Sequence, residues 1–188
     1  MLTRKQLIGL GGAAGSAALI AACGGDGGGP PKSKGGEAEA LDLKLIGSAL
    51  DLENTVIAAY TAGGELVNGS ARLATRAILE QEREHARHLS GLVGDLGGRP
   101  NPPKTSEEYA RAFPRLRSSD DALRFGVDME NAAVRFYLES LPKLSSPGLR
   151  RLAAAIATSE AGHASLLRSE LGRPPVPDAF VTGRSQVG

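Results

Sequence analysis

Apolar residues recur three and four positions apart over most of the chain from residue 38 onward, which is the spacing of helices that bury one face. Glycines follow the first, second and fourth of these stretches, as is typical of helix ends. Ser146 followed by Pro147 indicates a helix start, and Ser119 or Asp120 is the expected cap of the third helix. The pattern predicts four long helices, over residues 38–63, 71–96, 120–141 and 147–171.

The connections between these helices differ in length. Only a few residues separate the first helix from the second and the third from the fourth, whereas residues 99–119 form a long, proline-broken connection with one short helix over residues 106–113. Such a connection is long enough to travel the length of a bundle. The sequence therefore predicts an all-α fold: an antiparallel four-helix bundle with one long crossover between the second and third helices.

The two halves of the predicted bundle repeat each other. The segment DLENTVIAAY at residues 51–60 recurs as DMENAAVRFY at residues 128–137, with Asp, Glu, Asn and Tyr at the same offsets. At about the same distance beyond each segment lies a glutamate with a histidine three residues later. Two copies are too few for a solenoid, so the repeat indicates a bundle with two-fold pseudo-symmetry.

Six residues that can bind metal fall on the apolar stripes of these helices. Each half supplies one lone glutamate and one Glu-x-x-His pair, and the pairs use two of the only three histidines in the chain. Bundles that hold a dinuclear site carry one glutamate on each of two helices and such a pair on each of the other two. The predicted metal ligands are Glu53, Glu82, His85, Glu130, Glu160 and His163.

Four carboxylates inside one core need a counter-charge. Two like charges about 4 Å apart repel by roughly 4 kcal/mol at an effective dielectric constant near 20. Two divalent cations neutralise four carboxylates, and neutral imidazoles complete the coordination. Ligation by carboxylate and imidazole without thiolate suits iron or manganese. The residues leave the choice between these two metals open, and zinc would fit but would add no redox chemistry.

Tyr60 and Tyr137 lie seven residues beyond Glu53 and Glu130, two turns along the same helical face. Three roles stay open for these tyrosines. They orient ligand carboxylates by hydrogen bonds, they supply an electron during oxygen or peroxide reduction, or they are core side chains whose hydroxyls need a partner. The third histidine, His88, lies off the apolar stripe and is predicted to be on the surface.

With these motifs, residues 40–179 resemble the ferritin-like superfamily of di-iron carboxylate proteins, and within it the exported ferritin-like domain family that includes desiccation-related proteins. The resemblance implies that Glu82 and Glu160 bridge two metal ions. It implies that each histidine of a pair binds one ion and that the two lone glutamates are terminal ligands. Two iron ions are then the expected cofactor, with manganese as the alternative.

The same resemblance sets the expected function. Rubrerythrins commonly carry a cysteine-ligated iron domain, which a chain with Cys23 as its single cysteine lacks, and a tethered chain is unlike a subunit of a ferritin cage. We expect redox chemistry of the ferroxidase or peroxidase type on Fe(II), peroxide or oxygen. The alternative is a non-catalytic metal-binding or stress-protective module, because the ligand motif is shared by many reactions.

Residues 1–22 have the features of a bacterial export signal, since Arg4 and Lys5 precede an apolar stretch that ends in small residues. The segment LIAAC at residues 19–23 resembles a lipobox, so Cys23 is expected to carry lipid, with a free thiol as the alternative. Residues 24–36 have almost nothing apolar to bury and are predicted to be a tether. The expected location is the outer side of the cytoplasmic membrane, reached by the general or the twin-arginine route.

Charge gives no sign of a nucleic-acid partner. The formal net charge is +1, and it becomes −1 when residues 1–22, with two basic residues and no acidic one, are removed. The expected partners are metal ions and, through the lipid, a membrane, while the electron donor stays undetermined. The predicted organisation is a signal peptide, a lipidated cysteine with its tether, a ferritin-like domain and a disordered tail, over residues 1–22, 23–36, 37–180 and 181–188.

Overall fold

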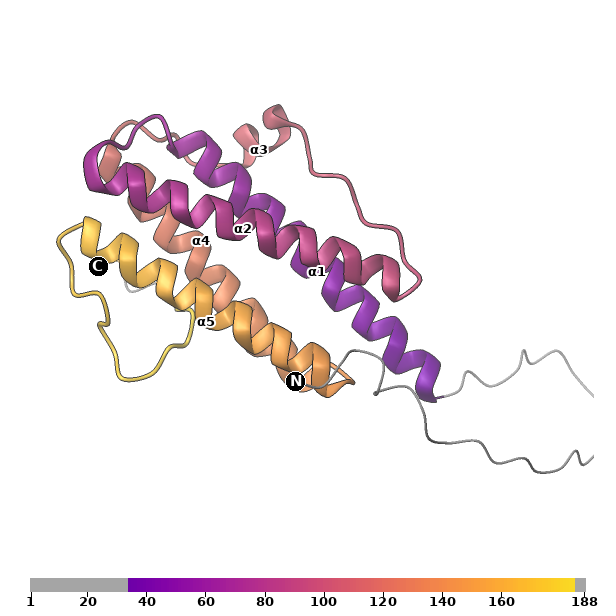
Figure 1. Ribbon diagram of the computed structural model, residues 1–188. Coiled ribbons are helices and arrows are strands. Elements are labelled where there is room, and N and C mark those ends of the chain that lie inside the picture. The colour runs from indigo at the N-terminus through magenta and orange to yellow at the C-terminus, as the bar shows by residue number, and fades with distance from the viewer. Residues whose placement is uncertain (1–33, 185–188) are drawn as a thin grey trace, which may run out of the picture. The chain divides into compact units, whose positions relative to one another are not determined.

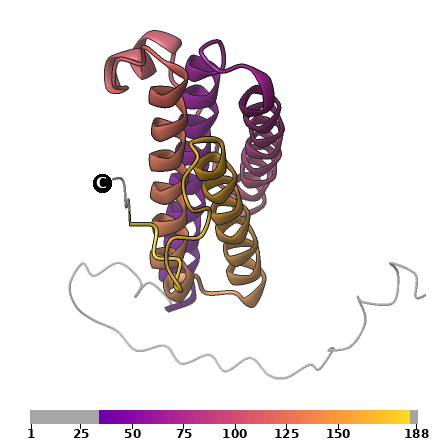
Figure 2. The same cartoon turned by 90° about the vertical axis from the view of Figure 1, so that its left-hand side faces the viewer.

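The computed structural model describes residues 34–184, and the regular structure in that range is entirely helical. Figure 1 shows four long helices side by side, and Figure 2 shows them after a quarter turn. The predicted all-α four-helix bundle is confirmed. The elements are α1 (Lys34–Gly63), α2 (Gly69–Asp95), α3 (Ser106–Ala112), α4 (Ser119–Ser140), the 3-10 helix η1 (Leu141–Lys143) and α5 (Pro147–Glu170).

The connectivity of the bundle is also as predicted. Short links join α1 to α2 and α4 to α5, and residues 96–118 form the long crossover, which carries α3 and runs back along α1 (Figure 1). One boundary differs, because α1 begins at Lys34 and so includes residues 34–36 of the predicted tether. The expected export signal and Cys23 lie outside the described residues.

The helix starts follow from their capping residues. Ser146 Oγ accepts a hydrogen bond from the Leu149 backbone N–H at 3.1 Å, and Pro147 is the first residue of α5, as predicted. The cap of α4 is Ser118, one residue before the expected position, and its hydroxyl accepts from the Asp121 N–H at 3.1 Å. These caps satisfy backbone donors that have no partner within the helix.

On every long helix a buried glutamate separates two groups of buried apolar side chains. On α1, Ile46 and Leu50 lie before Glu53, and Val56 and Tyr60 lie after it. One cluster comprises Ile46, Ala49, Leu50, Ala86, Leu89, Val93, Ala133, Tyr137, Leu144, Leu149, Ala153, Ile156 and Ala157. The other comprises Val56, Tyr60, Val67, Ala71, Ile78, Leu123, Val127 and Leu167. The carboxylates therefore form a polar layer between two apolar cores.

The second long helix of each half, α2 in one and α5 in the other, ends in the same way. The sequences LGGRPNPP at residues 96–103 and LGRPPVP at residues 171–177 follow α2 and α5. Gly97 and Gly172 adopt positive φ angles of 78° and 68°, which a glycine takes without a steric penalty. The N–H of the next residue donates to the carbonyl five residues back in each case, at 2.8 and 2.9 Å. The sequence repeat thus extends beyond the helices.

Each of these two segments folds back on the first helix of its own half. We call residues 96–113 the crossover strap and residues 171–184 the C-terminal strap. In the crossover strap, Asn101 Nδ2 donates to Asp51 Oδ2 of α1 at 3.3 Å. In the C-terminal strap, the Gly183 carbonyl accepts from Arg135 Nη1 of α4 at 3.1 Å, and Gly183 is buried. Residues 181–184 were predicted as disordered tail, yet this described part of the tail packs on α4.

Candidate metal centre

Six side chains from the four long helices meet in the polar layer. The lone glutamates come from α1 and α4, and the Glu-x-x-His pairs come from α2 and α5. All four glutamates are completely buried, at 0% exposure, whereas the side chains of His163 and His85 are 6% and 15% exposed. The structure therefore brings together every residue that the sequence singled out as a metal ligand: Glu53, Glu82, His85, Glu130, Glu160 and His163.

The potential ligand atoms fall into two overlapping groups, and within each group they lie within 4.8 Å of one another. Glu82 and Glu160 belong to both groups, which is the position that bridging ligands take. Each group adds one histidine and one lone glutamate. The first group is Glu53, Glu82, His85 and Glu160, and the second is Glu82, Glu130, Glu160 and His163.

Both histidines turn Nδ1 towards the carboxylates. His163 Nδ1 lies 2.7 Å from Glu82 Oε1, 3.1 Å from Glu160 Oε2 and 3.5 Å from Glu130 Oε2. His85 Nδ1 lies 3.0 Å from Glu160 Oε1 and 3.4 Å from Glu82 Oε2. The imidazole rings stack with their centroids 6.2 Å apart. Each ring thus faces both of the shared glutamates.

The chemistry of this donor set fits a pair of metal ions. Several inward-facing atoms are buried and have no hydrogen bond of acceptable geometry among the described residues: Glu53 Oε2, both oxygens of Glu82, His85 Nδ1, Glu130 Oε2 and Glu160 Oε1. Carboxylate oxygens only accept, so they cannot satisfy one another. A buried polar atom without a partner costs free energy, and a cation coordinated by these atoms removes that cost.

The lone glutamates are held in their neutral form when no metal is present. Burial raises the pKa of Glu53 well above its ordinary value, and the charges of Glu160 and Glu82 raise it further. Burial likewise raises the pKa of Glu130, although its contact with His163 opposes the shift. A metal ion must therefore displace protons from these carboxyl groups.

The pKa values of both histidines are raised, whereas burial alone lowers the pKa of a base. Burial on its own would lower the pKa of His163, but its close contacts with the carboxylates of Glu130, Glu160 and Glu82 outweigh burial and raise the pKa to about 12. Burial also opposes the charged form of His85, yet the close contacts of its Nδ1 with the carboxylates of Glu160 and Glu82 raise its pKa to about 9. Without metal, imidazolium groups thus supply the positive charge that the carboxylates require.

Each of the two tyrosines forms a hydrogen bond across the site. The Tyr60 hydroxyl donates to Glu130 Oε1, and the Tyr137 hydroxyl donates to Glu53 Oε1. Each tyrosine therefore reaches the lone glutamate of the other half rather than the one on its own helix. The reason is geometric, because side chains tilt towards the N-terminus of their helix and α1 and α4 run antiparallel. Burial, followed by the neighbouring carboxylate, raises the pKa of both phenols, so both remain donors.

Two further polar residues contact the site, and neither was predicted from the sequence. His163 Nε2 lies 3.0 Å from Gln81 Oε1 and 3.4 Å from Ser159 Oγ. An Nε2–H that donates to Gln81 leaves Nδ1 free to bind metal. Gln81 and Ser159 each come directly before the glutamate of a Glu-x-x-His pair. This shared position is the sequence signal by which they could have been found.

The remaining polar residues near the motifs lie on the surface. His88 is exposed, as predicted. Glu80 and Glu84 form ion pairs with Arg83 and Arg87 on the exposed face of α2. None of the described helices combines the length and the apolar character that a membrane span requires.

Comparison with known proteins agrees with this geometry. The family model for the ferritin-like domain matches residues 41–173. A conserved hypothetical protein from Mycobacterium tuberculosis has a similar structure, with a TM-score of 0.65, 20% sequence identity, and coverage of 76% of this chain and 99% of that one. Curated proteins give no match.

Two more solved structures share the fold. The dodecameric thioferritin from Bacteroides fragilis, a bacterioferritin-related protein, aligns with a TM-score of 0.60, 21% identity, and 72% and 86% coverage of this chain and that chain. A Dps mutant from Listeria innocua aligns with a TM-score of 0.60, 13% identity, and 71% and 95% coverage. Since the family model spans most of the described bundle, with all six candidate ligands inside the match, the chain belongs to the ferritin-like domain family.

Proposed function

We propose that this protein holds a pair of iron ions in its polar layer and uses them for redox chemistry on Fe(II), peroxide or oxygen. The observation that carries the proposal is the set of buried, unpartnered oxygen and nitrogen atoms that face one another between the four helices. Four carboxylates at this depth are unfavourable on their own and are neutralised by two divalent cations. Iron is proposed over manganese because of the family, since the ligand types accommodate both metals.

The two overlapping groups give each residue a role. Glu82 and Glu160 would bridge the ions, and each ion would also take the histidine and the lone glutamate of its own group. When bound, the ions supply the exchange of electrons with an oxidant. The chain's own part is to fix the ligands: Tyr60 and Tyr137 hold one oxygen of each lone glutamate, so that the other stays directed at the metal.

The proposal also places the protein on the outer side of the cytoplasmic membrane, as a lipid-anchored member of the exported, desiccation-related type. The support is the sequence before the bundle, where a basic and apolar leader ends at Cys23. Labelling cells with a radioactive fatty acid tests this location. We expect label and membrane association in the natural protein and neither in Cys23→Ser, and a labelled Cys23→Ser protein would contradict the anchor.

Metal analysis is the first test of the site. We expect two equivalents of iron per chain in protein purified from cells supplied with both iron and manganese, and a prompt change in near-ultraviolet absorbance when peroxide is added. Metal without a response to peroxide would refute the redox function and leave the site. A protein without metal would refute the site itself.

Substitution of the histidines separates the site from the fold. Replacing His85 and His163 together by alanine should abolish tight binding of the metal pair, because each ion loses its nitrogen ligand, while circular dichroism shows the helices still formed. His88→Ala is the matched control, since His88 is an exposed histidine on the same helix as His85 and should keep both metals. Unchanged stoichiometry in the double variant would contradict the ligand assignment.

One observation favours the alternative function, a metal-holding module without turnover. The four glutamates have no exposed surface and the histidines little, so the side chain of His85, at 15% exposure, is the most open of the six. A sealed site suits sequestration or stability more than catalysis. The peroxide experiment decides between the two functions, and rapid turnover with Fe(II) would exclude the alternative.

A further inference from the structure

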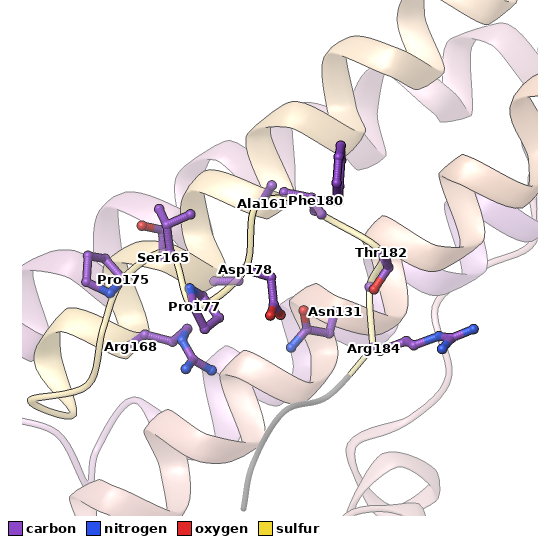
Figure 3. Close-up of a pocket in the computed structure, with 14 residues that line it drawn as sticks. Asn131, Ala161, Ser165, Arg168, Pro175, Pro177, Asp178, Phe180, Thr182 and Arg184 are labelled. Atoms are coloured by element: carbon purple, nitrogen blue, oxygen red, sulfur yellow. The ribbon is translucent and has the colours of Figure 1, made fainter.

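A cavity lies outside the metal centre, where the C-terminal strap crosses the outer face of α4 and α5. Its volume is about 90 Å³, several times the roughly 10–15 Å³ that one water molecule requires. In Figure 3 the side chains of Arg168 and Asp178 point from α5 and from the strap towards α4, which carries Asn131. Thr182 and Ser165 add two hydroxyl groups to the lining.

Arg168 is the unusual residue of this cavity. It is 7% exposed, and its Nε donates to the Pro174 carbonyl at 2.9 Å. Within residues 34–184 no carboxylate lies at ion-pair distance from its guanidinium group. A guanidinium group that is largely shielded from water and has no counter-ion is stabilised by a nearby anion. The cavity therefore presents a positive charge that an anion would neutralise.

Asp178 does not fill that role. It lines the cavity, but it is exposed and forms no ion pair with Arg168. An exposed carboxylate is screened by water and salt much more than a buried guanidinium group is. Arg184 also lines the cavity and is exposed like Asp178, so Arg168 is the buried charge of the lining and favours a negative ligand.

The lining also contains apolar side chains beside its polar residues, and these apolar side chains narrow the kind of anion that fits. The apolar part of the lining comprises two alanines of α5 and five residues of the strap, three of which, Val176, Phe180 and Val181, are exposed. These residues are Ala161, Ala164, Pro175, Val176, Pro177, Phe180 and Val181. Inorganic phosphate would use the charge of Arg168 but would leave these surfaces uncovered. A carboxylate with a short hydrocarbon body uses both, and a guanidinium group binds a carboxylate through two parallel hydrogen bonds.

We propose that this cavity is a binding site for a small organic carboxylate, with its charged end on Arg168 and its hydrocarbon end against the C-terminal strap. The site is separate from the metal ligands, so it stands whether or not the redox function is correct. Binding would hold the strap on the helix pair that carries Glu130, Glu160 and His163.

Nuclear magnetic resonance of the full-length protein tests the proposal with butyrate as the probe. We expect saturable shifts of the Thr182 and Gly183 amides on titration with butyrate. Butyramide, which has the same shape without the charge, should bind at least about tenfold more weakly, as should butyrate to Arg168→Gln, because each change removes a charged hydrogen bond. Arg151→Gln, an exposed arginine of the same helix, is the matched control and should bind normally.

A second variant guards against loss of folding in Arg168→Gln. Ser165→Leu leaves the arginine in place and fills the cavity, so it should also lose butyrate binding. Equal binding of butyrate and butyramide, or undiminished binding by Ser165→Leu, would overturn the proposal. Phosphate binding as tight as that of butyrate would overturn the choice of an organic ligand.

Discussion

The hydrogen bonds from Tyr60 and Tyr137 show how single residues hold the carboxylates of a crowded site in one conformation. A glutamate side chain has several rotamers, and a ligand that swings between them binds metal poorly. Because each phenol donates to one oxygen of a lone glutamate, the rotamer of that glutamate is fixed before any metal arrives. The tyrosines are thus positioning residues, anchored in turn by the two apolar clusters.

Removing either hydroxyl should cost stability. Tyr60→Phe and Tyr137→Phe keep the ring but leave a buried carboxyl oxygen without its donor, and we expect each to lower the free energy of unfolding of the metal-free protein by about 1–3 kcal/mol. Urea unfolding measures this loss. Tyr109→Phe is the control, because the Tyr109 hydroxyl only accepts a 3.3 Å bond from the Lys104 N–H and should matter less. Equal losses at all three positions would contradict the special role of the site tyrosines.

Gln81 should act on metal affinity rather than on folding. Its carbonyl oxygen lies 3.0 Å from His163 Nε2 and sets which ring nitrogen carries the proton. We expect Gln81→Ala to weaken metal binding by about 10–100-fold, as loss of such outer partners commonly does. Competition with a chelator measures the change, and Glu80→Ala, an adjacent exposed residue, should leave the affinity unaltered.

At the scale of elements, the straps depend on a few backbone positions. Gly183 has a φ of 67°, and a Cβ atom there would lie 2.5 Å from both the Arg135 nitrogen and the Asn131 carbonyl oxygen of α4. Backbone atoms in a helix cannot move aside, so only glycine allows the strap to approach α4 this closely. The contact explains why residues 181–184 pack on α4, although a disordered tail was predicted there.

Gly183→Ala should therefore detach the C-terminal strap and leave the bundle folded. We expect amide hydrogen exchange to become faster in residues 172–184 while the four long helices stay protected, because the strap contributes little to the two apolar clusters. Gly162→Ala is the control, since a Cβ at that helical position meets open space. Unchanged exchange in the strap would show that the contact with α4 does not hold it.

At the scale of the whole molecule, the charge of the polar layer makes stability depend on pH and on metal. In the metal-free protein the folded pKa values of His85 and His163, about 9 and about 12, lie above the ordinary value of about 6.5. Their contribution is fully present below pH 6.5 and is lost as pH rises through the folded values. The raised pKa values of Glu53 and Glu130 act in the same direction.

The metal-loaded protein should respond in the opposite way, because metal binds neutral imidazole and ionised carboxylate and so competes with protons. We expect the gap in melting temperature between metal-loaded and metal-free protein to widen between about pH 6 and about pH 9. Thermal unfolding followed by circular dichroism, with and without chelator, measures that gap. A gap that narrows over this interval would contradict the electrostatics described for the site.

The sequence predicted the bundle and the cluster of six candidate ligands because both depend on the spacing of residues along single helices. A buried glutamate with a histidine three residues later needs only one helix to be recognised, and glycines and Ser146 mark the helix ends. Contacts between segments far apart in the chain leave no such pattern in the sequence. The crossed tyrosine bonds, the approach of Gln81 to His163 and the packing of Gly183 on α4 all depend on which helices become neighbours, and spacing along one helix does not encode that.

The repeat of helix, helix and strap has a consequence for ancestry. Two identical half-length chains, each with one lone glutamate, one Glu-x-x-His pair and one strap, could assemble this same polar layer as a symmetric dimer. In such a dimer, every substitution would alter both halves of the site at once. Joining two such copies in one chain would remove that constraint, and each half could then change by itself, as the difference between Gln81 and Ser159 at the same position of the repeat illustrates.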